Sequence, residues 1–260
     1  MNAFYEQLDD NRFAASEHSR GPWDANAQHG GPPSALLGRA VESRPGERPG
    51  FRLARMTFEI SRPVPIAELV VSTRVLKSGR SAELVEAELA QPGGDPLLRA
   101  RALLVRVAEQ PQPAIADPTV LPGPDQAEPK PFFPVAYEVG YHNAMEWRFV
   151  SGAFQEPGPA TCWLRMRMPL VAGEQPSPLV RVLIAADSGN GVSTVLDWRT
   201  HTFINPDLTV HLHRYPVGEW VCLDARTTVD AGGIGLADTA LHDEKGVIGR
   251  GAQSLLVTAR

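Results

Sequence analysis

PLVRVLIAADS, residues 178–188, is the segment of the chain that says most about its architecture. It begins at a proline, a residue suited to the first turn of a helix, and it is followed by Gly189. Its apolar residues cover nearly the whole circumference of a helix, so we expect that helix to be buried. In the first half of the chain PSALLGRAVES, residues 33–43, overlays it without a gap. The chain therefore contains two related segments, each built around one helix.

Each predicted helix is followed by strands whose apolar residues alternate. A shift of 152 residues superposes 56–105 on 208–257 with ten identical positions, and the turns fall in step. The matched strands are FRLARMTFEI with FINPDLTVHL, ELVVSTRVL with EWVCLDARTTV, SAELVEAELA with GIGLADTAL, and LRARALLVRV with GRGAQSLLV. One helix and four antiparallel strands, repeated, predict an α+β fold with a curved sheet around each helix, not a doubly wound parallel sheet.

A proline-rich segment separates the two repeats. Residues 108–134 contain eight of the 24 prolines, a density that excludes both helix and central strand. We expect this segment to be extended and semi-rigid. It predicts an N-terminal unit of residues 1–107 and a C-terminal unit of residues 135–260.

Composition excludes several classes of protein. The chain has 260 residues, a net charge of −5 and no basic run, which argues against nucleic-acid binding. No stretch approaches 18 apolar residues, and the first residues lack a signal-peptide pattern. Cys162 and Cys222 lie in apolar stretches, as buried thiols in the reducing cytoplasm would. His211 and His213 share a strand face but have no spaced third ligand, so we expect no metal. We therefore expect a cytoplasmic protein without a membrane span.

Asp187 is the first candidate for catalysis. It ends the apolar helix, where burial and the negative pole of the helix both disfavour a carboxylate charge. A carboxylate in such a place suits a general base. The alternative is a solvent-exposed residue that caps the turn at Gly189.

The repeat supports the hypothesis that Asp187 is catalytic. Asn205 and Gln253 lie in the second strand set, and with Asp187 they could hold a water molecule and polarise a carbonyl group. Their counterparts by the same superpositions are Glu42, Leu53 and Arg101. Glu42 and Arg101 could only form an ion pair, so we expect the first-half site to be inactive. The alternative for Gln253 is an outward-facing polar residue.

WDANAQHGGPPSA, residues 23–35, forms a second cluster. Gly30 and Gly31 mark a tight turn into the first helix, whose exposed N–H groups could hold a carbonyl oxygen or an oxyanion. His29 precedes the turn and could pair with Asp24 in acid–base chemistry. The alternative is an ordinary hydrogen-bonded loop histidine.

At these motifs the chain resembles the acyl-CoA thioesterase II-like (TesB-like) proteins. The resemblance rests on GPWD and HGGPPSALL near the first helix, ADS at the end of the second, FINPDLTVHLHR, and AQSLL on the last strand. It covers nearly the whole chain. It implies a double hotdog fold, and it implies hydrolysis of acyl-CoA thioesters without a metal, a covalent intermediate or any cofactor beyond the coenzyme A of the substrate.

The resemblance also implies a water-activating set of an Asp, a Thr or Ser, and a Gln. Asp187 and Gln253 match the first and last members. The hydroxyl position falls on Asn205, which departs from the family pattern, although an amide can still donate a hydrogen bond. Thr209 is the nearest hydroxyl on the strand and is the alternative.

Two other functions compete with hydrolysis. The spacing of Asp24, Asn26, His29 and Ala35 resembles the motif of R-specific enoyl-CoA hydratases, which add water across a double bond, although Trp23 stands where that motif has Gly. A non-catalytic module that binds acyl-CoA or an acyl carrier would follow if Asn205 has removed the activity.

The leading hypothesis is an acyl-CoA thioesterase of lipid metabolism. Asp187 would act as general base on a water held by Asn205 and Gln253. The N–H groups of Gly30 and Gly31, or Gln253 itself, would stabilise the oxyanion, and His29 would position the substrate. We expect a homo-oligomer, because sheets of this kind leave edges and faces that pair.

Overall fold

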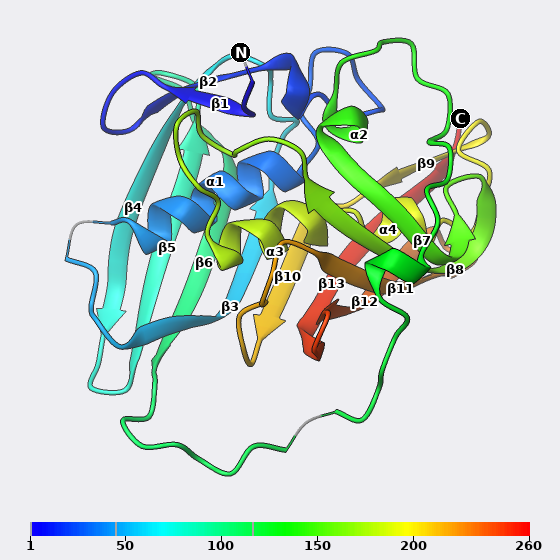
Figure 1. Ribbon diagram of the computed structural model, residues 1–260. Coiled ribbons are helices and arrows are strands. Elements are labelled where there is room, and N and C mark those ends of the chain that lie inside the picture. Colours follow the sequence, from blue (N-terminus) through cyan, green and yellow to red (C-terminus); the bar gives the residue numbers. More distant parts are fainter. Residues whose placement is uncertain (1, 45, 116) are drawn as a thin grey trace.

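The computed structural model describes residues 2–44, 46–115 and 117–260. Their strands form one antiparallel sheet around two central helices (Figure 1). The first half contributes β1 (Tyr5–Gln7), β2 (Arg12–Ala15), the 3₁₀ turn η1 (Glu17–Ser19), α1 (Gly31–Glu42), β3 (Phe51–Ile60), β4 (Glu68–Ser78), β5 (Ala82–Ala90) and β6 (Pro96–Arg106). After the 3₁₀ turn η2 (Pro124–Gln126), the second half contributes α2 (Tyr141–Ala144), β7 (Met145–Ala153), β8 (Glu156–Met166), α3 (Pro178–Ala186), α4 (Gly189–Val192), β9 (His201–Ile204), β10 (Asp207–Leu212), β11 (Val221–Val229), β12 (Ile234–Asp243) and β13 (Gly246–Ala259).

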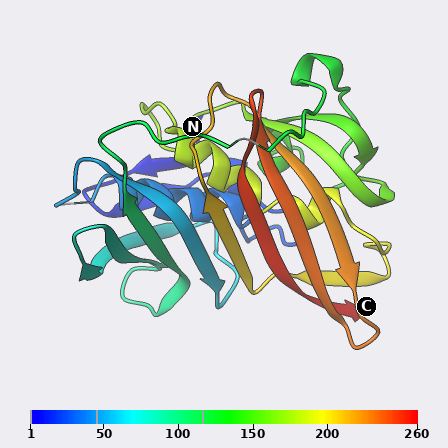
Figure 2. The same ribbon diagram turned by 90° about the horizontal axis from the view of Figure 1, so that it is seen from below.

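The order of the strands shows that the chain is a repeat. The sheet runs β1-β2-β4-β5-β6-β3 and then β10-β13-β12-β11-β8-β7, so the second half has the order of the first in reverse. The two halves join where β3 pairs with β10 (Figure 2). Thr57 lies opposite Thr209 at this seam, and these residues are equivalent in the repeat. A pseudo-twofold axis therefore passes between them, and the predicted double hotdog fold is confirmed.

The sequence analysis missed four strands, β1, β2, β7 and β8. The first two contain three and four residues, too few for a periodic signal. The first residues of β8 include Pro157 and Pro159, and prolines are unusual in strands, so the sequence pattern does not indicate a strand there. All four belong to the outer ends of the sheet, beyond the strands that carry the repeat pattern. The sequence analysis also took residues 203–212 as one strand, whereas Asn205 and Pro206 separate β9 from β10.

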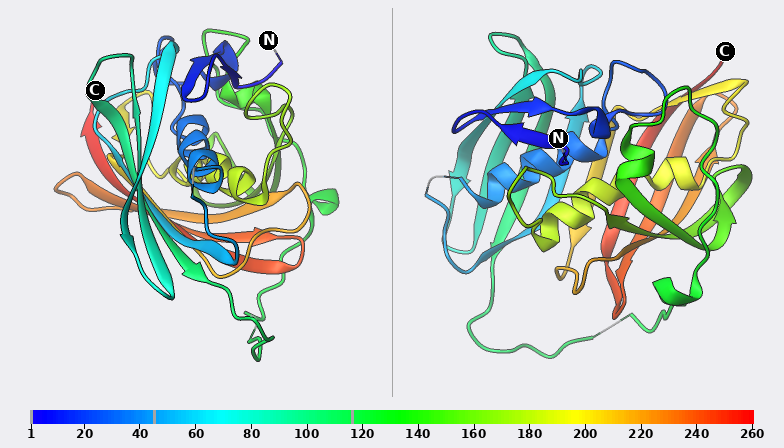
Figure 3. Two further views of the ribbon diagram at one scale, coloured as in Figure 1. Left: turned by 90° about the vertical axis from the view of Figure 1, so that its left-hand side faces the viewer. Right: turned by 45° about the horizontal axis from the view of Figure 1, so that its top comes forward.

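The helices α1 and α3 pack side by side inside the curved sheet (Figure 3). They run antiparallel, because Gly31 at the start of α1 touches Ile184 near the end of α3. At their crossing a Cβ on Gly38 would lie 2.2 Å from Leu183 Cδ1, so the glycine permits the close approach. Nearly every residue of α3 is buried, as its all-round apolar pattern predicts. Among the described residues, no helix is long and apolar enough to cross a membrane.

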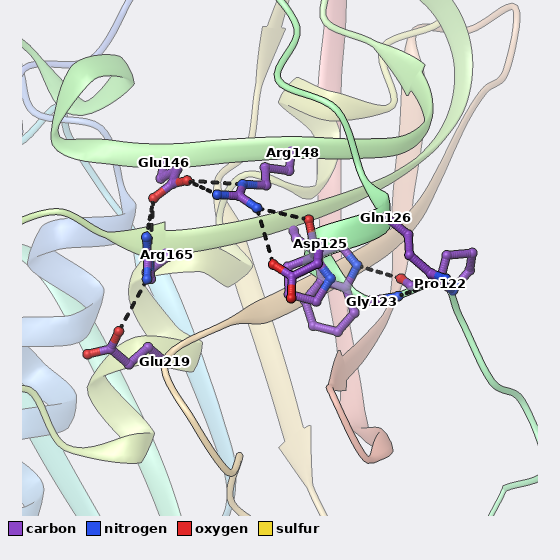
Figure 4. Close-up of polar contacts among 10 residues, drawn as sticks. Pro122, Gly123, Asp125, Gln126, Glu146, Arg148, Arg165 and Glu219 are labelled. Carbon is purple, nitrogen blue, oxygen red and sulfur yellow. Dashed lines mark hydrogen bonds and ion pairs between the residues drawn. The ribbon is translucent and has the colours of Figure 1, made fainter.

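The proline-rich segment leaves β6, loops outside the sheet and returns along the C-terminal half (Figure 1). Its described part contains no helix or strand apart from η2, and Ala116 lies outside the described residues. Trp163 Nε1 donates to the carbonyl of Pro122 at 2.9 Å, and Arg148 Nη1 donates to that of Pro124 at 3.1 Å. Arg148 belongs to an ion-pair network whose other members are Asp125, Glu146, Arg165 and Glu219 (Figure 4). The connector is thus attached to the outer face of the C-terminal unit.

Candidate active site

A buried carboxylate lies where the end of α3 meets the start of α1. Asp187 is the residue that ends α3, and its side chain is 6% exposed. Its Oδ1 atom accepts hydrogen bonds from Asn205 Nδ2 at 2.7 Å and from Gln253 Nε2 at 3.2 Å. The structure therefore places Asp187, Asn205 and Gln253 together. The alternatives of a solvent-exposed Asp187 and an outward-facing Gln253 do not hold.

The amide of Gln253 is fixed from both ends. Its Nε2 donates to the backbone carbonyl of Asp187 at 3.1 Å as well as to the carboxylate. Its Oε1 accepts the backbone N–H of Asn190 at 3.1 Å, which sets the orientation of the amide. Gln253 thus holds the end of α3 and the start of α4 together, and its amide hydrogens are directed to Asp187.

The other carboxylate oxygen, Oδ2, faces α1. It lies 3.2 Å from His29 Nδ1 and so close to Gly30 that an added Cβ would lie 2.7 Å from it. The His29 Nδ1 atom accepts the N–H of Gly31 at 3.0 Å. A ring nitrogen that accepts a hydrogen bond uses its lone pair and carries no proton. The ring proton of neutral His29 therefore belongs on Nε2, and Nδ1 donates no hydrogen bond to Oδ2. Oδ2 is therefore the oxygen with capacity left.

Burial lowers the pKa of His29, and the nearby carboxylate of Asp187 opposes this effect. The ring of His29 is stacked on that of Tyr141, with 3.8 Å between the ring centroids and an interplanar angle of 9°. The hydroxyl of Tyr141 in turn donates to the carbonyl of Ile184 at 2.7 Å. The sequence analysis missed Tyr141, because no motif or periodicity marks a single tyrosine in the segment after the linker.

Two weaker candidates lie elsewhere. Thr209 Oγ1 donates to Thr57 Oγ1 at 3.3 Å on the pseudo-twofold axis. Asp24 is exposed, and its carboxylate accepts the backbone N–H of Asn26 at 2.8 Å. Within the described part of the chain, neither residue hydrogen-bonds or pairs with Asp187 or His29. The Asp24–His29 pair suggested by the sequence is therefore not formed.

The first-half counterpart differs from the expected ion pair. Glu42 accepts a hydrogen bond from the hydroxyl of Ser177, and Arg101 pairs instead with Glu86 at 3.5 Å. Burial raises the pKa of Glu42, although the Ser177 hydrogen bond acts in the opposite direction. A cavity of about 420 Å³ opens beside Glu42, at the end of the helix pair opposite Asp187.

The expectation that Arg101 matches Gln253 was wrong by one residue. Arg101 lies opposite Thr57, whereas the residue opposite Thr209 is Ala252. The true counterpart of Gln253 is therefore Ala102, which is fully buried and has no polar side chain. The first-half site lacks the amide that fixes the carboxylate in the second, which supports the prediction that it is inactive.

The fold and the site together define a double hotdog protein with a buried carboxylate between its two units. Family models match both halves: the acyl-CoA thioesterase N-terminal domain matches residues 19–106, and the acyl-CoA thioesterase C-terminal domain matches residues 124–257. The chain belongs to the acyl-CoA thioesterase family and is a thioester hydrolase.

Several solved structures share the fold over nearly the whole chain. A protein from Thermobifida fusca YX, provisionally classed as a thioesterase II, has a TM-score of 0.77 and 18% identity, covering 99% of this chain and 96% of its own. A hotdog-fold protein of unknown function from Alicyclobacillus acidocaldarius has a TM-score of 0.76 and 16% identity, covering 100% and 97%. The acyl-CoA thioesterase II TesB2 of Mycobacterium marinum has a TM-score of 0.68 and 14% identity, covering 98% and 96%. A search of curated proteins found no significant match.

Proposed function

We propose that this chain hydrolyses an acyl-CoA to a free acid and coenzyme A, with Asp187 as the general base. The observation that carries the proposal is the unequal environment of the two carboxylate oxygens. Oδ1 accepts two amide hydrogen bonds, from Asn205 and Gln253. Oδ2 faces Gly30 and the Nδ1 atom of neutral His29, and among the described residues it accepts no hydrogen bond. A water molecule bound at Oδ2 would lose its proton to that oxygen as it attacks the thioester carbonyl.

The carboxylate is prepared for this role by the amides. Asn205 occupies the position at which the family resemblance implies a hydroxyl, and its Nδ2 makes the short contact to Oδ1 that a hydroxyl would make. The sequence analysis expected these amides to hold the water, but both donate to the carboxylate instead. They act by fixing the rotamer of Asp187, so that Oδ2 keeps one direction. Holding a base in a single geometry is a large part of what such a site contributes to the rate.

The oxyanion of the tetrahedral intermediate needs donors on the α1 side. The Gly31 N–H is taken by His29, and the amide of Gln253 is taken by Asp187. Among the described residues, the N–H of Gly30 has no acceptor. This N–H group and the Nε2 proton of His29 are the donors left for a carbonyl oxygen. Collapse of the intermediate expels a thiolate, a leaving group that needs no strong acid.

The competing functions lack such support. A hydratase mechanism needs Asp24 beside His29, and Asp24 is exposed and bonded to Asn26 instead. A binding module would follow from the loss of the hydroxyl at Asn205, but the donor is retained there. The cytoplasmic location, the role in lipid metabolism and the homo-oligomer stay predictions.

The test is an assay of free thiol released from a panel of acyl-CoAs, with wild type beside Asp187→Ala and Gln253→Ala. We expect release by wild type that collapses in Asp187→Ala and falls in Gln253→Ala. Hydration of crotonyl-CoA without thiol release would favour the hydratase. Thermal stabilisation by acyl-CoA without either reaction would favour the binding module.

A further inference from the structure

The side chain of Tyr141 touches both sides of the proposed site. Its ring lies against His29 at 3.8 Å, on the α1 side. Its hydroxyl donates to the carbonyl of Ile184 at 2.7 Å and lies 3.0 Å from Ser188 Oγ, on the α3 side. These two residues flank Asp187 in the chain. A single side chain therefore contacts both His29 and the end of α3 that carries Asp187.

The environment of Tyr141 allows it no second position. The side chain is 1% exposed, and Trp147 meets its ring edge-on at 5.8 Å. Its backbone N–H donates to the carbonyl of Arg20 at 2.9 Å. Burial raises the pKa of its phenol well above the ordinary value, so the hydroxyl keeps its proton and can donate a hydrogen bond at neutral pH.

The segment that carries Tyr141 is itself attached to the loop that leads to His29. Arg20 Nη1 donates to the carbonyl of Val139 at 3.1 Å, and the hydroxyl of Tyr137 donates to the carbonyl of Gly21. The loop, the ring and the end of α3 thus form one packed unit, in which a shift of the ring would move His29 relative to Asp187.

On the basis of the function proposed above, we propose that Tyr141 is a positioning residue that sets the distance and angle between His29 and Asp187. The stacked ring keeps the plane of the imidazole fixed, so that Nδ1 receives Gly31 and Nε2 is directed away from the carboxylate. The hydroxyl, through its hydrogen bond to Ile184, fixes the position of the last turn of α3 relative to His29. Tyr141 would act through these two groups and would not touch the substrate.

Two substitutions separate the two contacts. Tyr141→Phe keeps the ring and removes the hydroxyl, and we expect kcat to fall about 3- to 10-fold with KM within about twofold. Tyr141→Leu removes both, and we expect kcat to fall about 30- to 100-fold. The matched controls lie at the other end of the helix pair. Tyr215→Phe removes a partly buried hydroxyl near Glu42 that accepts the N–H of Leu53, and Phe13→Leu removes a buried ring from β2 that packs against Arg39. Both controls should keep the kcat of the wild type.

The pH dependence supplies a readout that general destabilisation would not give. His29 must be neutral to accept the Gly31 N–H, and burial keeps its pKa low. Without the covering ring, water reaches the imidazole and its pKa moves up toward the ordinary value. The acid limb of the kcat/KM profile should therefore shift to higher pH in Tyr141→Leu, and a ¹⁵N NMR titration of His29 should show the same shift. The carboxylate of Asp187 acts on the His29 pKa in the wild type and in Tyr141→Leu alike, so the shift reports the loss of the covering ring.

The outcomes are distinct. Wild-type kcat and an unchanged His29 titration in both Tyr141 variants, beside an inactive Asp187→Asn, would overturn the role of Tyr141 and leave the proposed function intact. A loss of activity that only follows the folded fraction, with no change in the His29 titration, would also overturn it. If Asp187→Asn is as active as wild type, the proposed function fails instead, and the NMR titration still decides whether Tyr141 fixes His29. If Tyr141→Leu does not fold, Tyr141→Phe and its kcat decide the matter.

Discussion

A single methyl group added at Gly30 should disable the site without disturbing the fold. Gly30 precedes α1 with φ −67° and ψ −17°, a conformation that alanine adopts without strain. A Cβ there would lie 2.7 Å from Oδ2 of Asp187 and 3.0 Å from Oδ1, whereas ordinary contact begins at 3.4 Å. Because Oδ1 is held by two amides, the carboxylate can relieve this overlap only by leaving them.

The required movement sets the expected loss. Oδ2 must retreat by about 0.7 Å, a displacement close to those that cost about 100-fold in rate when they misplace a reacting group. We expect the kcat of Gly30→Ala for thiol release to fall about 10- to 100-fold. The free energy of unfolding should fall by about 1–3 kcal/mol, because the overlap also disturbs the two amide hydrogen bonds of a buried carboxylate.

Gly38→Ala is the matched control in the same helix. Its Cβ would lie 2.2 Å from Leu183 Cδ1, at the crossing of the helices and not at the site. This overlap should cost about 1–3 kcal/mol in stability, measured by urea unfolding, and leave the specific activity of the folded protein unchanged. Wild-type kcat and wild-type stability in Gly30→Ala would show that Gly30 does not constrain the carboxylate of Asp187. Equal losses of activity in both variants would count against this constraint as well.

Two further predictions concern Asn205 and His242. Asn205→Thr keeps a donor for Oδ1 of Asp187 and should retain kcat within about tenfold. Asn205→Asp places a second carboxylate beside the first and should lower kcat about 100-fold or more. The reverse order of the two variants in a thiol-release assay would contradict the proposed geometry. Burial lowers the pKa of His242, whose two ring nitrogens have no partner among the described residues, although Asp224, Asp117 and Asp243 act in the opposite direction. The unfolded chain therefore takes up a proton below about pH 6.5 that the folded chain does not, so stability should fall as the pH drops from 7 to 5. His242→Phe should make the urea-unfolding free energy less dependent on pH over this range, and an unchanged slope would count against the burial argument.

The parts of the fold that could be predicted are those with a strong periodic pattern. Residues 178–188 have an apolar pattern that only a buried helix satisfies, and α3 occupies Pro178–Ala186 with Asp187 at its end. The proximity of Asp187 and Gln253 followed from the family resemblance and from a polar residue in an apolar strand. The position of Asn205 followed from counting along the strand, and its contact with Asp187 matches that count.

The register of the last strand could not be predicted by a superposition without gaps. The turn between the paired residues Ala90 and Pro96 covers residues 91–95, whereas the turn between His242 and Val247 covers residues 243–246. That one missing residue turns Arg101 outward and makes Ala102 the counterpart of Gln253. The sequence shows identities on both sides of the turn but not which residue the hairpin omits.

The contacts that complete the site were also beyond the sequence. His29 was expected beside Asp24, five residues away, because neighbours in the chain are the easiest partners to suggest. The structure gives it Asp187, which is brought to it by the antiparallel packing of α1 and α3. Tyr141 reaches the same place from the segment after the linker, where no pattern indicates a tertiary contact.

Asp187, and not its counterpart Glu42, is proposed to activate the water that cleaves a thioester. The most direct measurement is the rate of free-thiol release from acyl-CoA by wild type, Asp187→Asn and Glu42→Gln, each shown to be folded by its thermal unfolding. Both substitutions remove one carboxylate at an end of the same helix pair, a buried one at Asp187 and a partly buried one at Glu42. We predict that Asp187→Asn lowers kcat by about 100-fold or more and that Glu42→Gln leaves it within about threefold of wild type. Full activity in Asp187→Asn, or its loss in Glu42→Gln alone, would contradict the account.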